Sequence, residues 1–82
     1  RKYFRIEYAG NSFEGQLFYI SGARDKKAIN RLEFYLKPVC DIENITDAST
    51  TNHIELIKPG KVKLSNESWV IDPSDKAKIR LI

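Results

Sequence analysis

Alternating apolar and polar residues at the start of the chain predict a β-hairpin. Strands over Lys2–Ala9 and Ser12–Ile20 flank Gly10-Asn11, a dipeptide typical of a two-residue primed turn. A turn closed at this dipeptide puts the large apolar groups on one face, so the register and the burial pattern agree. On that face the opposed pairs are Tyr8 with Phe13, Ile6 with Gly15, and Phe4 with Leu17. We expect the large residues of these pairs to be mostly buried.

The other face of this hairpin carries aromatic and charged residues. Its opposed pairs are Tyr3 with Phe18, Arg5 with Gln16, and Glu7 with Glu14. Two close carboxylates can share a proton or a cation, which makes the glutamate pair a candidate for acid–base chemistry. Arg5 lies diagonal to Glu14 in this register, so we interpret the pair as a neutralised surface feature.

The spacing of apolar residues after the hairpin predicts a helix over Asp25–Leu36, with Asp25 as its N-cap and Pro38 beyond its end. One face of this helix carries apolar residues at helical spacing: Ala28, Ile29, Leu32, Tyr35 and Leu36. Phe34 is left outside that face. A strand over Arg31–Lys37 also fits the alternation of residues. We favour the helix because Ala28 extends the apolar face upstream.

The last third of the sequence is strand-like and divided by turn signals. Strands over His53–Lys58 and Lys61–Leu64 flank Pro59-Gly60, which suits a type II turn with the glycine at positive φ. A three-residue loop at this point sets Leu56 opposite Leu64 and keeps apolar side chains together. These strands are therefore predicted to form a second hairpin.

The remaining segments complete the predicted order. Val39–Ile45 indicates a short irregular strand and Asp47–Asn52 a polar loop. Strands over Ser68–Asp72 and Ala77–Ile82 are joined by the turn signal of residues 73–76. A four-residue loop there pairs Val70 with Ile79, Ser68 with Leu81, Trp69 with Arg80, and Ile71 with Lys78.

Together these elements predict an α+β fold, a mostly antiparallel β-sheet with one helix in the order ββ(α)βββ. Without the helix, the alternative is a small all-β barrel. A chain of 82 residues builds only one modest core, so we expect a single small domain over residues 1–82. The balance of 41% hydrophobic and 30% charged residues is typical of a soluble globular protein.

Charge and cysteine content narrow the expected partners and location. The net charge of +3 hides an acidic segment, residues 38–57, which contains four acids and neither lysine nor arginine. The basic flanks permit a polyanionic partner. Cys40 is the only cysteine, which rules out a disulfide within the chain and favours a reducing cytoplasm. The longest uncharged run, Gly15–Ala23, is far shorter than the ~18 apolar residues of a membrane span.

The sequence offers little catalytic chemistry. His53 is the only histidine, and it lies thirteen positions from Cys40 with no metal-ligand spacing between them. A structural zinc site draws three or four ligands from cysteine and histidine, so we expect neither a metal nor a cofactor. We interpret Cys40 as a buried core thiol and expect that the protein is not an enzyme.

Our first functional hypothesis is a small non-enzymatic binding or regulatory module that acts through a protein–protein interface. An apolar patch of Tyr3, Phe18 and Ile71 on the second face of the sheet is the candidate interface, for a protein partner or for self-association. We infer no small-molecule substrate and no membrane partner.

The alternative hypothesis is a nucleic-acid-binding module, because exposed aromatics beside cations stack single-stranded bases. Its candidate residues are Arg24, Lys26, Lys27, Arg31, Trp69, Lys78 and Arg80. One observation separates the two hypotheses: whether the basic groups of residues 24–31 and 61–80 converge on one surface beside exposed aromatics.

Overall fold

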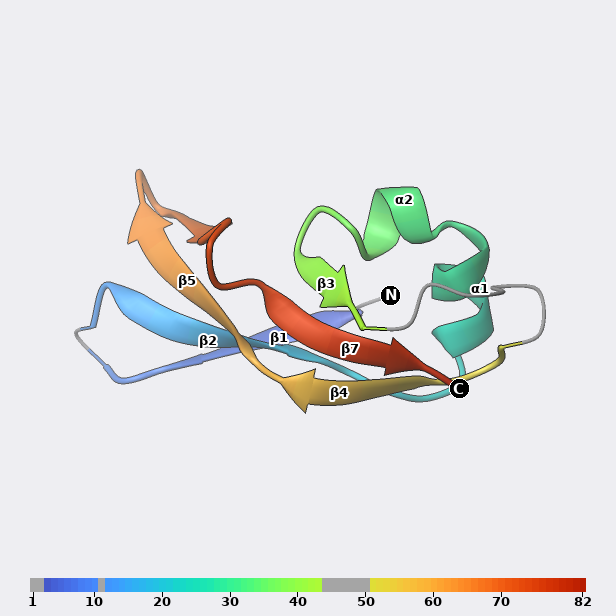
Figure 1. Cartoon of the computed structure of the whole chain (residues 1–82). Helices are drawn as coiled ribbons and strands as arrows, with labels where there is room; N and C mark the ends of the chain where they lie inside the picture. Colours follow the sequence, from blue (N-terminus) through green and yellow to red (C-terminus); the bar gives the residue numbers. More distant parts are fainter. Residues whose placement is uncertain (1–2, 11, 44–50) are drawn as a thin grey trace.

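The structure, a computed structural model, describes residues 3–10, 12–43 and 51–82 (Figure 1). Two short helices, α1 (Asp25–Asn30) and α2 (Leu32–Tyr35), follow the first two strands. The strands are β1 (Phe4–Tyr8), β2 (Glu14–Tyr19), β3 (Cys40–Ile42), β4 (Ile54–Lys58), β5 (Gly60–Ser65), β6 (Ser68–Ile71) and β7 (Ala77–Leu81). Asn11 and most of the predicted loop over Asp47–Asn52 lie outside the described residues.

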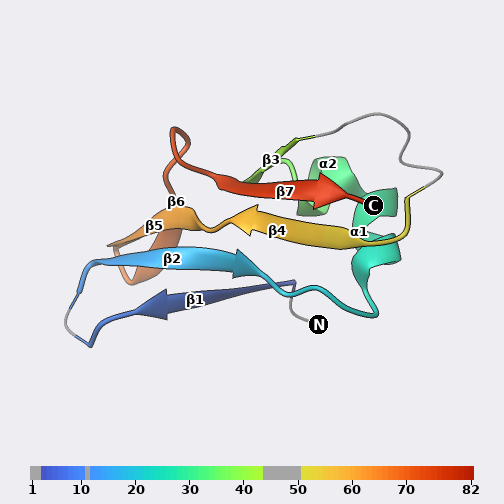
Figure 2. The same ribbon diagram turned by 60° about the horizontal axis from the view of Figure 1, so that its bottom comes forward.

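The strands form two sheets rather than one. Sheet A has the order β1-β2-β5-β6 and is antiparallel throughout, whereas sheet B has the order β3-β7-β4, with β3 parallel and β4 antiparallel to β7. The helices lie at one end of the molecule, and sheet A extends beyond sheet B at the other (Figures 1 and 2). The predicted α+β class is confirmed, and the described strands form no closed barrel. Five strands follow the helices, one in each of the five strand segments predicted after residue 38, although the overall order ββ(α)βββ included only three.

The hydrophobic core is built from strands of both sheets and from the helical segment. Its most deeply buried large side chains come from a helix end, β5 and β7, and they are Leu36, Val62 and Ile79. Each of these elements contributes a face of alternating or helically spaced apolar residues. Strand β7 shows this clearly, since Ala77, Ile79 and Leu81 are buried while the residues between them are exposed.

The predicted helix is confirmed, with a break at Arg31. That residue has φ −129° and ψ 45°, which divides the helical segment into α1 and α2. Ala28, Ile29 and Leu36 of the predicted apolar face are buried, whereas Phe34, outside that face, is 75% exposed. The prediction of Asp25 as the N-cap is wrong, because Arg24 occupies that position.

Asp25 instead lies in the core, where its carboxylate joins three segments of the chain. One oxygen, Oδ1, accepts hydrogen bonds from the Tyr19 hydroxyl at 2.6 Å and from the Gly22 backbone N–H at 3.0 Å. The other oxygen accepts the backbone N–H of Ile54 at 3.0 Å. Burial and this contact with Asp25 raise the pKa of Tyr19 above its ordinary range. Asp25 therefore holds β2, α1 and β4 together.

The register predicted for the first hairpin is wrong by two residues. The Ser12 N–H donates to the Ala9 carbonyl, as a tight turn requires, but β1 then pairs Phe4 with Tyr19 and Ile6 with Leu17. The Ser12 side chain bonds to the backbone of Glu14 and holds the extra residues out of the ladder. A shift of two residues preserves the faces, so Phe4, Ile6 and Leu17 still point toward the core.

The two aromatic residues predicted nearest the turn are not buried. Tyr8 is 56% exposed and Phe13 is 71% exposed, because sheet A extends past sheet B at this end. Tyr8 lies opposite Gly15, and its ring packs on Trp69 of β6 with centroids 4.9 Å apart. A Cβ atom at Gly15 would lie 2.8 Å from the Glu7 carbonyl oxygen, so only glycine fits at this point of the ladder.

The hairpin predicted at Pro59-Gly60 is absent from the structure. Strand β4 pairs with β7 in sheet B, while β5 pairs with β2 and β6 in sheet A, so the chain passes from one sheet to the other at this dipeptide. The φ of Gly60 is not positive. Glycine is needed at this position for a different reason, because a Cβ atom on residue 60 would lie 2.5 Å from the backbone nitrogen of Ala77. Leu56 therefore faces Ile79 rather than Leu64.

The pairing predicted between the last two strands is also wrong. Strand β6 pairs with β5 through a two-residue turn at Asn66 and Glu67, which have φ of 51° and 67°. Both values are those of a type I′ turn, which favours the right-handed twist of a hairpin. Trp69 consequently lies opposite Leu64, and Arg80 lies on β7 in the other sheet.

Candidate functional site

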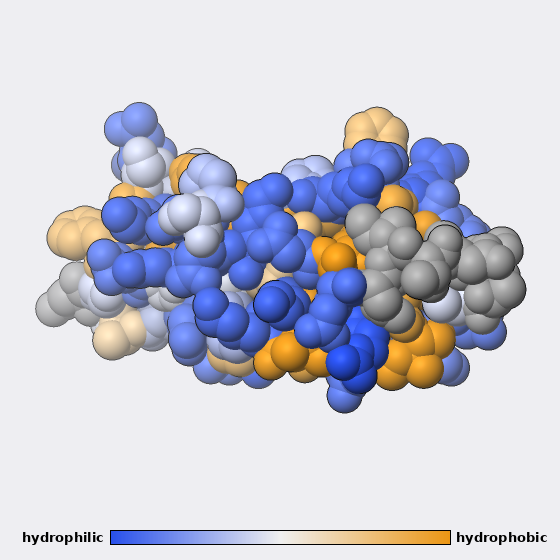
Figure 3. All heavy atoms as spheres, viewed as in Figure 1, coloured by the Kyte–Doolittle hydropathy of each residue, from blue (hydrophilic) through white to orange (hydrophobic). Residues whose placement is uncertain are grey.

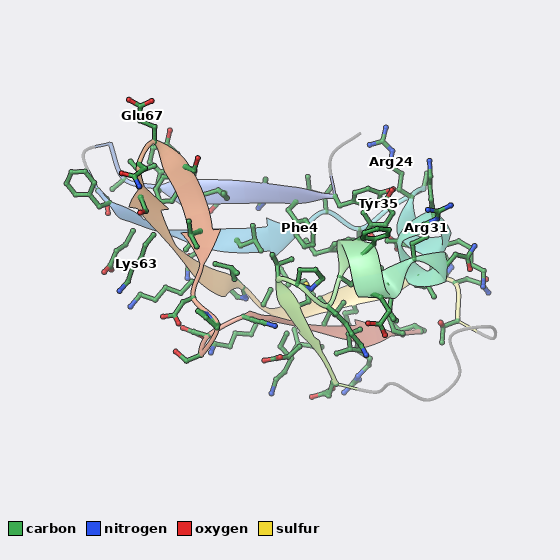
Figure 4. All side chains as sticks on the ribbon, turned by 90° about the horizontal axis from the view of Figure 1, so that it is seen from above. Phe4, Arg24, Arg31, Tyr35, Lys63 and Glu67 are labelled. Atoms are coloured by element: carbon green, nitrogen blue, oxygen red, sulfur yellow. The ribbon has the colours of Figure 1, made fainter. Side chains whose placement is uncertain are left out.

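Four residues of the helical segment share one side of it. Arg24, Lys27, Arg31 and Tyr35 follow one another at intervals of three or four residues, which is the spacing of one helix face. This face borders the buried one formed by Ala28 and its neighbours. The break at Arg31 leaves these side chains on the same flank of the segment: Figure 4 shows Arg24, Arg31 and Tyr35 together at the helical end of the molecule.

Tyr3, which directly precedes β1, completes a shallow open groove with this helix face. The groove has a volume of about 590 Å³ and is lined by Tyr3, Arg24, Lys27 and Tyr35; we call it the α1 groove. The rings of Tyr3 and Tyr35 pack with centroids 4.9 Å apart and planes at 30°. Phe34 extends the aromatic surface, with its ring 6.4 Å from that of Tyr35 and largely in solvent.

Arg24 and Lys27 make the groove basic, and none of the described residues that line it is acidic. Asp25 belongs to the same helix but turns its carboxylate into the core, and Glu33 pairs with Lys37 at 3.0 Å. The ion pairs within the described part of the chain involve none of the three cations of this helix face. Cations without a nearby counter-charge attract an anionic ligand most strongly.

The structure separates the other basic candidates from this groove. The Lys26 ammonium donates to the Thr51 carbonyl at 2.8 Å, which turns it away from Lys27. Arg80 bonds to Glu43 at 2.8 Å, a contact that raises the pKa of its guanidinium, and Lys78 lies on the same strand. Hydrophilic residues cover most of the face on which β7 lies (Figure 3). Trp69 packs against Tyr8 instead of Arg80.

The basic groups therefore form separate surfaces. Lys63 projects at the end of sheet A farthest from Arg24 and Arg31 (Figure 4). It lies opposite Glu14, and Lys61 approaches the same carboxylate at 4.0 Å. Lys61, Lys63 and Arg80 thus lie beside acids, whereas the cations of the α1 groove lie beside aromatic rings.

The three residues of the predicted protein interface do not come together. Tyr3 packs on Tyr35 in the α1 groove. Phe18 lies on the outer face of β2, where the Arg5 guanidinium covers its ring at 4.6 Å. Ile71 lies on β6 and packs against the core. No single surface contains this set.

The candidate catalytic groups are also apart. Cys40 is 3% exposed and pairs with Ala77 at the start of β7, whereas the His53 backbone bonds to Ile82 beyond the end of that strand. The carboxylates predicted to be opposed are separated as well, because Glu7 faces Gln16. Within residues 3–10, 12–43 and 51–82, no group of three His, Cys, Asp or Glu side chains is placed to hold a metal ion.

Burial of Cys40 predicts a loss of stability in alkali. Burial, with a smaller contribution from Asp41, raises the pKa of the thiol from 9.0 to about 12. Above pH 9 the unfolded chain therefore loses the thiol proton while the folded protein keeps it. We expect the free energy of unfolding to fall by up to about 1.4 kcal/mol per pH unit between these values. Urea unfolding from pH 7 to 11 measures this slope. Cys40→Ala is the control, and an equal slope in that variant would contradict the prediction.

The sequence singled out the cations of the α1 groove and Tyr3, but it did not predict that Tyr35 and Phe34 lie beside them. Tyr35 has the spacing of the buried helix face, and it does lie at the margin of the core. The available signal was its distance of four residues from Arg31, which places the two side chains together on a helix. Phe34 was already outside the apolar face, and this alone predicts exposure.

No protein-family model matches the chain, and no curated protein or solved structure matches it either. Neither helix in the described ranges is long and apolar enough to cross a membrane. Function is therefore inferred from the geometry of the α1 groove.

Proposed function

We propose that this protein is a non-enzymatic binding module that takes up single-stranded nucleic acid in the α1 groove. The observation that carries the proposal is the aromatic pair Tyr3–Tyr35 bordered by Arg24 and Lys27, with no acid among the described residues of the groove lining. Aromatic rings stack unpaired bases, and arginine and lysine bind the phosphates between them. The basic groups of residues 24–31 and 61–80 do not converge on one surface, which disfavours the interface predicted over both segments. The proposal therefore keeps only the α1 groove, where two cations adjoin a packed pair of rings.

A nucleic acid is favoured over a protein partner at this groove by its lining. Tyrosine and arginine are common in both kinds of interface, but lysine is depleted at the centres of protein interfaces, and Lys27 lines the α1 groove beside Arg24. The exposed Phe34 ring offers a further stacking surface at the margin. An open, shallow groove also suits a flexible strand that is held at several points.

The non-enzymatic part of the proposal rests on the separation of the candidate catalytic groups. Cys40 is buried and has a raised pKa, which leaves little thiolate at neutral pH, and His53 lies at the other end of β7. A cytoplasmic location is part of the same proposal, because this thiol has no partner for a disulfide within the chain.

The proposal predicts salt-dependent binding of a short single strand. With about three phosphate contacts, the slope of log K against log salt concentration should be about −2. We expect Lys27→Gln to weaken binding several-fold and to reduce the slope by about 0.7, because one contact is lost. Fluorescence anisotropy of a labelled ten-nucleotide oligothymidylate measures both quantities.

Lys26→Gln is the matched control, since this neighbouring lysine bonds to the Thr51 carbonyl and lies outside the groove lining. It should bind the oligonucleotide as the unchanged protein does. Equal losses from Lys26→Gln and Lys27→Gln would show that only the overall charge matters. A duplex of the same length and a poly-glutamate peptide complete the test: tighter binding to either one contradicts the proposed ligand class.

Stacking is tested separately from charge by Phe34→Ala. Its ring is 75% exposed, so the substitution should leave the fold unchanged, as circular dichroism will check. Loss of one stacked base weakens binding by about 1–3 kcal/mol. The salt slope should stay constant because no phosphate contact is removed. A change in slope without a change in affinity would contradict a stacking role.

A further inference from the structure

Strand β1 is an edge of sheet A, and none of the described strands pairs with its outer side. The Ile20 N–H donates to the Tyr3 carbonyl at 2.8 Å, and antiparallel strands alternate from that point. Alternation makes Arg5 and Glu7 the residues of β1 that bond to β2, so the backbone groups of Phe4, Ile6 and Tyr8 point away from the sheet. Figure 2 shows β1 at the margin of the molecule, with no other described element beyond it.

The sequence of this edge is complementary to itself in the antiparallel direction. When two copies of Phe4-Arg5-Ile6-Glu7-Tyr8 are opposed about Ile6, each Arg5 lies opposite a Glu7. Each Phe4 then lies opposite a Tyr8, and Ile6 lies opposite its own counterpart. Opposite charges and aromatic pairs across strands each stabilise a sheet.

Backbone hydrogen bonding agrees with the same register. The residues whose N–H and C=O groups point outward have even numbers, and pairing about Ile6 sets each even residue opposite an even residue. Ile6 faces Ile6, and Phe4 faces Tyr8, so every outward donor meets an acceptor. The inner faces of the two sheets also coincide, because directly opposed residues point to the same side.

Neighbouring registers are disfavoured by charge. A shift of two residues in one direction opposes Arg5 with Arg5, and a shift in the other direction opposes Glu7 with Glu7. Like charges directly across a strand pair destabilise it. A shift of one residue misaligns the outward backbone groups. Charge and hydrogen bonding thus select a single pairing.

We propose that two copies of this chain associate through their β1 strands, antiparallel and centred on Ile6, to join their A sheets about a two-fold axis. The side chains are already placed for this pairing. Arg5 bonds to Glu7 of its own strand at 2.9 Å, and the ring of Phe18 lies beneath its guanidinium. Across the axis, Arg5 and Glu7 of the two copies alternate in sign, so each charge has opposite charges on both sides.

The contact is small, since one strand of five residues contributes the backbone pairing on each side. Interfaces of this size are below those of permanent dimers, so we expect a weak, concentration-dependent dimer. The proposal is independent of ligand binding, because the side chains that line the α1 groove differ from those of residues 4–8; Tyr3 enters the edge argument only through its backbone carbonyl.

Sedimentation velocity across a concentration series tests the pairing with charge-reversed variants. We expect Arg5→Glu and Glu7→Arg each to raise the dimer dissociation constant at least tenfold, because each opposes like charges. An equimolar mixture of the two variants should recover the dimer, since both acidic side chains of one variant then lie opposite the two arginines of the other. The double variant Arg5→Glu/Glu7→Arg should also recover it, and its recovery shows that loss in the single variants is not misfolding.

Glu33→Arg is the control for net charge. It changes the charge by the same amount as Glu7→Arg, but at residue 33 of α2, whose side chain is 78% exposed. It should leave the dimer intact. A chain that stays monomeric up to 1 mM overturns the proposal. So does a dimer that persists in Arg5→Glu, or a mixture of the single variants that stays monomeric, because each result excludes this register.

Discussion

Asp25→Asn is expected to lower the free energy of unfolding by about 2–4 kcal/mol, because an amide cannot satisfy the three donors that the carboxylate accepts. With its oxygen toward Tyr19 and Gly22, the asparagine presents its NH₂ group to the Ile54 N–H. With the amide flipped, the NH₂ group meets the Gly22 N–H instead. Either orientation leaves two donors facing each other in the core.

Thermal and urea unfolding measure this loss, and Tyr19→Phe is the matched control. That variant removes one donor and leaves the carboxylate with the other two, so it should cost about 1 kcal/mol. A domain of this size has a total stability of roughly 4–12 kcal/mol, so the asparagine variant approaches global unfolding. A loss from Asp25→Asn no larger than that from Tyr19→Phe would contradict the bridging role of the carboxylate.

Gly60→Ala is expected to destabilise the protein by about 3 kcal/mol, because the added methyl group meets backbone rather than a movable side chain. The ideal Cβ position lies 2.5 Å from the Ala77 nitrogen and 3.1 Å from the Lys76 carbonyl carbon. Relief requires the two sheets to separate where the chain passes between them. For a domain of this length, a loss of this size lowers the melting temperature by about 15 °C.

Gly10→Ala provides the comparison for this substitution. A Cβ atom at Gly10 meets nothing within 4 Å, and its φ is not positive. We expect a change within about 0.5 kcal/mol. Differential scanning calorimetry of both variants checks the contrast, and similar melting temperatures would show that the β4–β5 passage tolerates side chains.

Local signals in the sequence predicted local structure well. The helix over Asp25–Leu36 follows from its apolar spacing, and the exposure of Phe34 follows from its position outside that face. The faces of β1 and β2 are also correct, because a period of two survives a shift of two residues. The sequence thus predicted the α+β class and which side of each of these elements is buried.

Strand pairing failed where the competing arrangements have the same alternation. Pro59-Gly60 is typical of a turn, but the structure needs glycine there because the backbone of Ala77, a residue distant in sequence, leaves no room for a side chain. The true turn at Asn66 and Glu67 lacks the usual glycine, so its signal is weak. The α1 groove was predicted only in part, because the contact of Tyr3 with Tyr35 joins residues that are far apart in the sequence and depends on tertiary packing.

The position of β7 in sheet B affects how the chain folds during synthesis. The β1–β2 and β5–β6 hairpins join neighbouring segments, so each closes a short loop and can form early. Strands β3 and β4 have no such partner, since both pair with β7, which is synthesised after them. Until β7 emerges from the ribosome, β3 and β4 lack the strand they pair with and expose unpaired backbone groups beside an incomplete core. Chaperone protection of the nascent chain should therefore matter most between the synthesis of β4 and that of β7.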